Sequence, residues 1–173
     1  MENFKGKLAV ITGGASGVGF AIGEALAKEG AKVILTDIEA ASLETSAKAL
    51  TDQSLDVHFK VADVSNPESM MQLAAWCESE FGSVHLLFNN AGVAPAELLP
   101  IWQTKPNDWQ WAFGVNVMGV VHGVRVFTPL MLQAAAADSG YRGHIVNSAS
   151  MAGLVNAPNM GVYNASKHAV VSL

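Results

Sequence analysis

The sequence predicts an α/β protein with a doubly wound parallel sheet that carries helices on both faces. Short continuous apolar runs of strand length recur along the chain, as in strands buried on both sides of a parallel sheet. Amphipathic stretches of helical length separate these runs, and a glycine-rich loop follows the first one. The 173 residues suit one domain over residues 1–173, because no linker or internal repeat divides them.

Five segments have the apolar character of the expected strands, and the helices between them have recognisable ends. The strands are Lys7–Thr12, Lys32–Asp37, Val57–Asp63, His85–Asn90 and Gly143–Ala149. Gly30 is placed to end the first helix, while Pro67 lies in the first turn of a helix that ends at Gly82. A long apolar stretch begins at Pro106, and Pro129 should bend it or lie after a break.

Composition excludes several classes of protein. The net charge is −5 and no Lys/Arg-rich run occurs, so a nucleic-acid partner is not expected. The single Cys77 excludes an internal disulfide and a cysteine-based zinc site, and the histidines lack metal-like spacing, so no metal site is predicted. No apolar stretch reaches the length of a bilayer span, and the first run is too short for a signal peptide. We therefore expect a soluble cytoplasmic protein with no membrane partner.

The loop TGGASGVG joins the first strand to the first helix and indicates nucleotide binding. Glycine lets the backbone turn tightly and approach a pyrophosphate, and the helix that follows offers free N–H groups and the positive end of its dipole. A plain tight turn is the alternative, but the place directly after the first strand favours a nucleotide. The expected contacts in this loop are Gly13, Ser16, Gly17, Val18 and Gly19.

Asp37 ends the second predicted strand, where its carboxylate can accept both ribose hydroxyls of an adenosine. The same carboxylate would repel a 2′-phosphate, and no basic residue in the neighbouring loop offsets that repulsion. These features favour NAD over NADP, with Ile38 also beside the cofactor. The alternative is that Asp37 only caps the following turn.

Polar side chains also end the third and fourth predicted strands. Asp63 could bond an adenine amino group, although an isolated acid is more often a solvated loop residue. The amides of the NNAG sequence could tie adjacent strand ends together beside the cofactor, although an ordinary Asn/Gly turn is the alternative. The expected cofactor contacts here are Asp63, Val64, Asn89, Asn90, Ala91 and Gly92.

Taken together, these motifs resemble those of the short-chain dehydrogenase/reductase family. The resemblance covers the whole chain and implies a Rossmann-like domain that binds NAD(P) and transfers hydride between nicotinamide and an alcohol or ketone. It also implies a cytosolic homodimer or homotetramer, often built through the two long helices near Asn116 and Tyr163. The matching elements are TGGASGVG, Asp37, ADV at 62–64, NNAG, Asn116 in FGVNVMG, Ser150 in IVNSASMAG, and YNASK at 163–167.

Tyr163 and Lys167 are four residues apart, so they project from one face of a helix. An alcohol that loses hydride must also lose its hydroxyl proton, and a free tyrosine, with a pKa of about 10, is protonated at neutrality. A neighbouring ammonium favours the phenolate, so the spacing predicts a tyrosine acid/base tuned by a lysine. The resemblance implies that Lys167 also holds the nicotinamide ribose hydroxyls. The alternative is a solvated helix face with a half-buried ring.

The resemblance assigns roles to two further polar residues. Ser150 lies thirteen residues before Tyr163 and would hydrogen-bond the substrate oxygen, stabilising charge there; Ser148 is close by, but the spacing favours Ser150. Asn116 would hold a water that links Lys167 to solvent. Asparagine is a poor residue for a helix interior, so its place among Val and Gly indicates a specific contact.

The family normally continues beyond the residues matched here, with further strands and a substrate-covering segment. We therefore expect an incomplete domain that lacks the C-terminal strands and one wall of the substrate pocket. The pocket-side residues present are mostly apolar, which favours a hydrophobic secondary alcohol or ketone. Two functions stay open: an NAD-dependent oxidoreductase, or a nucleotide-binding fragment that binds NAD or a partner subunit without turnover.

Overall fold

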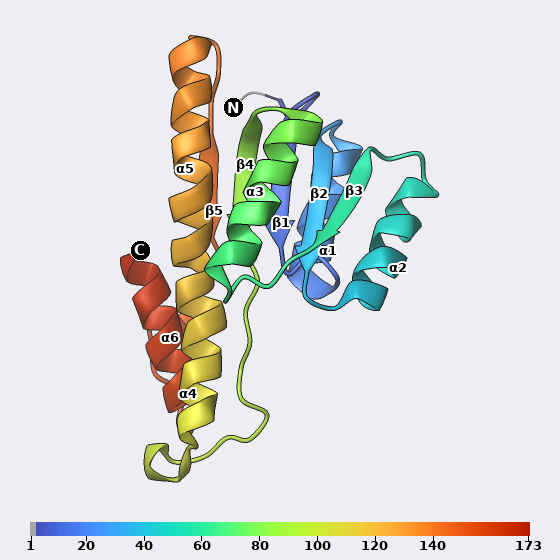
Figure 1. Cartoon of the computed structure of the whole chain (residues 1–173). Helices are drawn as coiled ribbons and strands as arrows, with labels where there is room; N and C mark the ends of the chain where they lie inside the picture. The colour runs from blue at the N-terminus through green and yellow to red at the C-terminus, as the bar shows by residue number, and fades with distance from the viewer. Residues whose placement is uncertain (1–2) are drawn as a thin grey trace.

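The computed structural model describes residues 3–173 and contains a five-stranded parallel sheet with helices on both faces (Figure 1). The strand order is β3-β2-β1-β4-β5, so the predicted doubly wound α/β fold is confirmed. The chain moves outward from β1 in one direction, then crosses to β4, which makes the β1–β4 boundary a topological switch point. The strands are β1 Leu8–Thr12, β2 Lys32–Asp37, β3 Val57–Val61, β4 Val84–Asn89 and β5 His144–Asn147.

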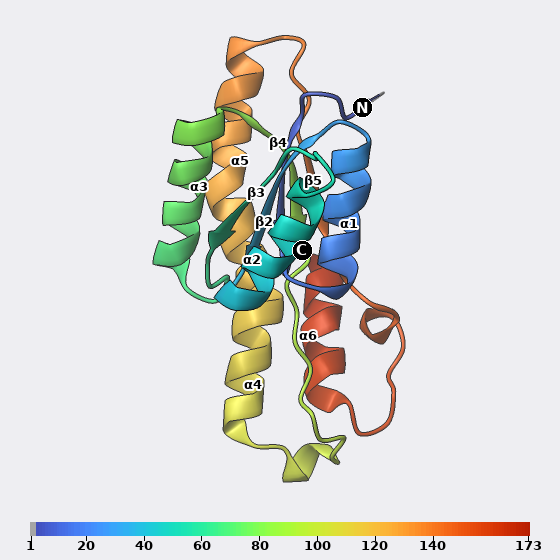
Figure 2. The ribbon, with the colours of Figure 1, turned by 90° about the vertical axis from the view of Figure 1, so that its right-hand side faces the viewer.

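Six α-helices cover the sheet and extend below it. Figure 2 shows α3 and α5 on one side of the sheet and α1 and α6 on the other. The helices are α1 Gly17–Lys28, α2 Ala40–Thr51, α3 Pro67–Phe81, α4 Pro106–Phe113, α5 Gly119–Ala137 and α6 Gly161–Ser172. A π-helix at Gly114–Met118 joins α4 to α5, and short 3-10 turns lie at Ile101–Gln103 and Met151–Gly153.

The central strand β1 shows why the strands read as continuous apolar runs. All of its residues are buried. Leu8 and Val10 pack into the core with α3 and α5, whereas Ala9 and Ile11 pack into the core with α1 and α2. Successive side chains of a strand point to opposite faces, so a strand covered on both faces needs an apolar residue at every position.

Helix α3 begins and ends as predicted. The Asn66 side chain accepts hydrogen bonds from the backbone N–H groups of Glu68 and Ser69, Pro67 is in the first turn, and Gly82 follows the last turn with φ of 79°. Cys77 lies on this helix and is fully buried. The predicted places of Pro67 and Gly82 were therefore correct at the level of single residues.

Cys77 gives a direct test of this packing. Burial raises the pKa of its thiol to about 12, and only the thiolate reacts readily with thiol reagents. We expect the folded protein to show no fast reaction with an aromatic disulfide reagent at neutral pH, and the denatured protein to release one equivalent of chromophore. Fast labelling of the folded protein, measured by absorbance, would contradict the burial of Cys77.

The long apolar stretch is irregular at a different place from the one expected. We expected Pro129 to bend the helix or to lie after a break; α5 continues through Pro129, so the break is absent. Phe127 and Met131 flank this proline and are buried against the sheet, so tertiary packing outweighs the hydrogen bond that proline removes. The irregularity is the π-helix, which contains Asn116.

One helical run among the described residues, Pro106–Ala137, is long and apolar enough to cross a membrane by length and composition alone. By that criterion the expectation that no stretch would reach this length is wrong. The run contacts β4, α3 and α6, and 39% of its most apolar 18-residue window is buried. Part of its apolar character is therefore explained by packing within the domain.

Candidate active site

A continuous cleft lies at the carboxyl ends of β1, β2 and β4, at the switch point where doubly wound sheets bind ligands. Two adjoining hollows of about 670 and 440 Å³ form this cleft. We call them the large and the small hollow. The residues that line both are Gly13, Asp37, Ala91, Gly92 and Val93.

The glycine loop forms the floor of the large hollow. Gly13 and Gly17 have φ of 67° and 54°, in the left-handed region that glycine adopts without strain. A Cβ on Gly13 would lie 2.8 Å from the Cα of Ala91, so the loop and the NNAG segment are in close contact. Ser16 precedes α1 without a side-chain cap, so the first backbone N–H groups of α1 are left for another partner.

Asp37 holds the backbone on two sides. Its Oδ2 accepts a hydrogen bond from Ala15 N (3.1 Å), and its Oδ1 accepts one from Glu39 N (3.2 Å). Asp37 therefore does cap the following turn, which was the alternative interpretation. The same carboxylate also lines both hollows, so capping is not its whole role. Among the described residues, neither Lys nor Arg lines the small hollow, whereas Ile38, 59% exposed, offers it an apolar surface.

The loop after β3 forms the far wall of the small hollow. Strand β3 ends at Val61, so Asp63 belongs to the loop rather than to the strand end that we predicted. Asp63 Oδ1 accepts hydrogen bonds from the N–H and hydroxyl groups of Ser65 at 2.8 and 2.7 Å. The carbonyl oxygen of Val64 accepts a hydrogen bond from His122 of α5 at 2.8 Å. Asp63 and Val64 both line the small hollow.

The two asparagines of NNAG tie β4 to its neighbours, as predicted. Asn90 Nδ2 donates to Thr12 O of β1 (3.1 Å), and Asn89 Nδ2 donates to Asn147 Oδ1 of β5 (2.9 Å). Asn90 lines the large hollow. Asn89 is 3% exposed and does not line the cleft, so it acts within the frame of the site rather than at its surface.

Tyr163 and Lys167 project from α6 into the large hollow. Lys167 Nζ lies 5.8 Å from the centre of the Tyr163 ring and donates a hydrogen bond to Ser148 O at 2.8 Å. Lys167 is only 5% exposed, so the solvated-face alternative is wrong. Burial lowers the pKa of Lys167 below its usual value, because desolvation penalises the ammonium.

Asn116 is buried in the π-helix and makes the specific contact that the sequence indicated. Its Oδ1 accepts from Val93 N (2.7 Å), while its Nδ2 donates to Val93 O (2.9 Å) and to Ser166 Oγ (2.8 Å). Ser166 lies on α6 beside Lys167 and donates to Tyr163 O. Asn116 therefore joins the NNAG segment to the helix that carries Tyr163, although it does not itself line the cleft.

Ser150 differs from Tyr163 and Lys167 because it does not line the large hollow. It begins a 3-10 turn, and its Oγ accepts a hydrogen bond from Ala152 N at 3.1 Å, which leaves its own proton free to donate. Ser148 rather than Ser150 lines the large hollow, and Ser148 Oγ donates to Asn90 Oδ1 at 3.2 Å. The structure thus gathers Tyr163 and Lys167 at the cleft but does not place Ser150 in its lining.

Sequence reasoning missed several residues of the cleft. Trp111 and Val115 line the small hollow and are one helical turn apart, so their spacing could have placed them on the same face. Ala149 lines the large hollow from an irregular segment that carries no such signal. Thr12 Oγ1 accepts hydrogen bonds from the N–H groups of Asn90 and Ala91, both at 3.0 Å.

Comparisons with known proteins agree with this geometry. A short-chain dehydrogenase from Burkholderia phymatum, solved in complex with NAD, is 49% identical with a TM-score of 0.93, over 99% of this chain and 59% of that one. The 1-deoxy-11-beta-hydroxypentalenate dehydrogenase of Streptomyces avermitilis is 37% identical over 93% of this chain and 58% of its own length. The NADP-dependent (R)-specific alcohol dehydrogenase of Lentilactobacillus kefiri is 34% identical over 98% of this chain and 64% of its own.

The chain thus spans about three fifths of the length of these relatives. Their cofactors differ, since NAD is bound in the first and the third is named as NADP-dependent. A family model described as short chain dehydrogenase matches residues 7–173. The chain therefore belongs to the short-chain dehydrogenase family of oxidoreductases.

Proposed function

We propose that this chain supplies the cofactor site and the acid/base group of an NAD-dependent oxidoreductase that acts on a secondary alcohol or ketone. The observation that carries the proposal is that one hollow joins the glycine loop to Tyr163 and Lys167. A nucleotide site and a proton-transfer pair thereby share a single space. Mixing the full-length protein with NAD and a panel of secondary alcohols tests it, with NADH absorbance as the readout.

The residues present suit a dinucleotide. Asp37, Ile38 and Asp63 would hold the adenosine in the small hollow, and the glycine loop with the free N–H groups of α1 would hold the pyrophosphate. Tyr163 and Lys167 would face the nicotinamide end. The glycines of the loop leave space that side chains would fill. When bound, the nicotinamide supplies the group that accepts or gives up hydride.

Proton transfer falls to the chain's own residues. Tyr163 would take the hydroxyl proton of an alcohol at its phenolic oxygen, or return one to a ketone. Lys167, with its lowered pKa, releases a proton more readily than a free lysine, which suits a group that passes protons onward. Ser150, whose proton is free, would donate to the substrate oxygen. Both side-chain amide hydrogens of Asn116 already donate hydrogen bonds, to Val93 O and to Ser166 Oγ. A water that links Lys167 to solvent would therefore bond the backbone of Asn116.

The substrate side is apolar. A smaller hollow of about 20 Å³ adjoins Tyr163 and includes Ala94, Leu98 and Met160 among its lining residues. Most of its lining is apolar, although Glu97, Thr104, Asp108 and Asn159 also line it, and a mostly apolar lining favours a hydrophobic small molecule. Exposed apolar side chains on α5 and α6, such as Leu132 and Val171, also fit a cytoplasmic homodimer or homotetramer assembled through these helices.

Asp37→Asn tests the preference for NAD. The asparagine keeps an oxygen for Ala15 N but loses the negative charge. Hydrogen bonds to charged groups contribute about 1.5–3 kcal/mol, so we expect NADH affinity to fall roughly tenfold or more. NADPH affinity should rise relative to NADH, because the carboxylate no longer repels the 2′-phosphate. Fluorescence titration with both reduced cofactors measures the ratio, and an unchanged ratio would contradict the assignment.

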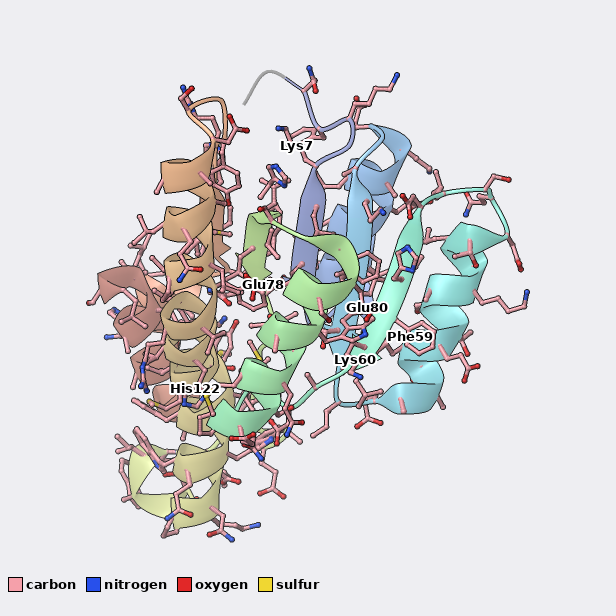
Figure 3. The ribbon with its side chains drawn as sticks, turned by 45° about the horizontal axis from the view of Figure 1, so that its top comes forward. Lys7, Phe59, Lys60, Glu78, Glu80 and His122 are labelled. Carbon is pink, nitrogen blue, oxygen red and sulfur yellow. The ribbon has the colours of Figure 1, made fainter. Side chains whose placement is uncertain are left out.

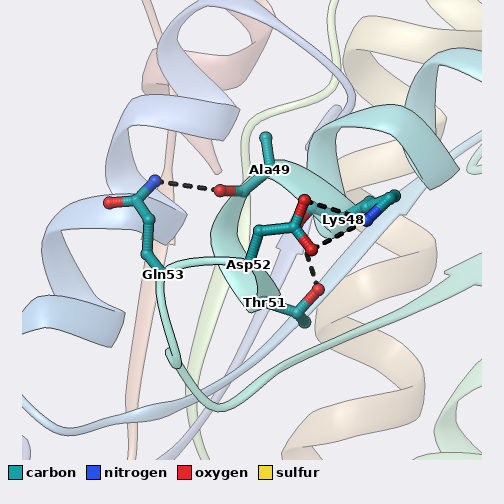
Figure 4. Close-up of polar contacts among 5 residues, drawn as sticks. All are labelled: Lys48, Ala49, Thr51, Asp52 and Gln53. Atoms are coloured by element: carbon teal, nitrogen blue, oxygen red, sulfur yellow. Dashed lines mark hydrogen bonds and ion pairs between the residues drawn. The ribbon is translucent and has the colours of Figure 1, made fainter.

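Asp52→Asn provides the matched control. Asp52 lies after α2 and pairs with Lys48 at 2.7 and 2.9 Å, away from the cleft, in a cluster that also includes the bond from Gln53 to Ala49 O (Figure 4). Its replacement changes net charge by the same amount as Asp37→Asn. The control should bind both cofactors like the wild type, since an exposed ion pair contributes little.

A nucleotide-binding protein without turnover is the second candidate. One observation favours it: Ser150 is not in the lining of the large hollow. In that case NADH titration should show saturable binding while every alcohol and ketone stays unreacted. Turnover of any secondary alcohol by the full-length protein would eliminate this candidate.

A further inference from the structure

His122 is a buried polar residue that the proposed chemistry does not use. It lies on α5, is 6% exposed, and its Nδ1 is 2.8 Å from the carbonyl oxygen of Val64, 58 residues earlier in the chain. A carbonyl can only accept, so Nδ1 must carry the proton and donate it. Figure 3 shows His122 on the side of α5 that faces the start of α3. Its bond therefore ends on the loop that walls the small hollow.

That loop is fixed from two helices. Asp63 N donates to Ser69 Oγ of α3 at 3.0 Å, and Val64 O is held by His122 of α5. Helix α5 also lies so close that a Cβ on Gly119 would be 2.8 Å from Val64 Cγ2. Among the described residues, the His122 bond is the one directed polar contact that fixes the loop from α5. A buried imidazole is tolerated when such a bond offsets its desolvation, whereas packing alone would be served by leucine.

We infer that His122 is a positioning residue for the adenine end of the cofactor cleft. By holding Val64 O it sets the direction in which the Asp63 carboxylate faces the small hollow. Asp63 Oδ1 is already bonded to Ser65, which leaves Oδ2 for the amino group of an adenine. The inference rests on the proposed function, because it needs a cofactor that brings an adenine to this hollow.

The test compares two cofactors whose bases differ at position 6 and at the adjoining N1. NADH carries the 6-amino group of adenine and an N1 without hydrogen, whereas reduced nicotinamide hypoxanthine dinucleotide carries a 6-oxo group and an N1–H. We expect His122→Leu to weaken NADH binding roughly three- to tenfold, the value of one hydrogen bond, and to change binding of the hypoxanthine analogue less than twofold. Fluorescence titration of the full-length protein gives both dissociation constants.

Two further variants separate positioning from folding. His122→Asn should restore NADH affinity, because asparagine Nδ2 takes the place of histidine Nδ1, whereas His122→Gln moves the donor and should behave like His122→Leu. Met131→Ala, a core change on the same helix, should lower the melting temperature without affecting NADH binding.

The outcomes are distinct. Equal weakening of both cofactors in His122→Leu, or no weakening of either, would overturn the inference. Failure of His122→Asn to rescue NADH binding would also overturn it. If the wild-type protein binds neither cofactor, the proposed function fails and the inference fails with it. Hydrogen exchange at Ser65 N, which donates to Asp63 Oδ1, gives a readout that needs no cofactor. The exchange rate of this N–H should rise in His122→Leu and stay at the wild-type value in His122→Asn.

Discussion

Tyr163→Phe is expected to lower turnover by about a hundredfold to ten-thousandfold, the usual contribution of one general acid/base group. The phenylalanine keeps the ring beside Lys167 but removes the oxygen that would exchange a proton with the substrate. NADH affinity should change little, because the glycine loop and Asp37 are untouched. Steady-state rates with NAD and secondary alcohols measure the first effect, and fluorescence titration measures the second.

The other tyrosine of the chain is the matched control. Tyr141 is buried, and its hydroxyl donates to Val84 O at the opposite end of β4 from the cleft. Tyr141→Phe should lower the melting temperature, since it leaves a buried carbonyl without its partner, while the rate per folded molecule stays normal. If Tyr163→Phe turned over at the wild-type rate, Tyr163 could not be the acid/base group.

Gly19→Ala is expected to abolish measurable NADH binding and to destabilise the fold. A Cβ at this position would overlap the carbonyl oxygen of Gly13 and lie 2.6 Å from Asn90 Nδ2. The first of these is backbone, so relief requires movement of the glycine loop that forms the floor of the large hollow. Overpacking of this kind costs about 1–3 kcal/mol and sometimes more. Urea denaturation and cofactor titration measure the two effects.

Gly82→Ala is the control that separates the steric clash at Gly19 from the backbone strain of replacing a glycine with alanine. Gly82 has φ of 79° at the end of α3, and its Cβ would meet no atom within 4 Å. The substitution should therefore cost only backbone strain, about 1–3 kcal/mol because φ of 79° with ψ of −143° lies in a region that glycine alone adopts readily, and it should leave NADH affinity unchanged. Equal NADH affinity in Gly19→Ala and the wild type would show that close contact between the loop and Asn90 is dispensable.

Sequence reasoning succeeded where the physical signal is local. The apolar runs located all five strands. Burial on both faces explains this for β1 and β2, whereas the edge strands β3 and β5 are partly exposed, so the expectation of full burial is wrong for them. The start at Pro67 and the stop at Gly82 were found because each depends on a few neighbouring atoms. The spacing of Tyr163 and Lys167 placed them on one helical face, and both line the large hollow.

It failed where the deciding contact is distant. Helix α5 continues through Pro129 because the residues beside that proline are buried against the sheet, which no local pattern reveals. Ser148 lines the cleft in place of Ser150 because of how the chain leaves β5, not because of residue type. His122 bonds a residue 58 positions away, so a single histidine in an apolar stretch carries no sign of it.

The π-helix at Gly114–Met118 lets one extra residue fit between α4 and α5 without turning one helix relative to the other. A π turn holds about one residue more than an α turn for nearly the same rotation about the axis. Deleting one residue there would therefore restore a regular helix while Trp111 keeps its place beside the small hollow. The deletion would instead remove the wide turn that contains Asn116, and with it the side-chain bonds that join Val93 to Ser166. A shortening that leaves the helix straight would thus loosen the connection between the segment after β4 and the helix that carries Tyr163.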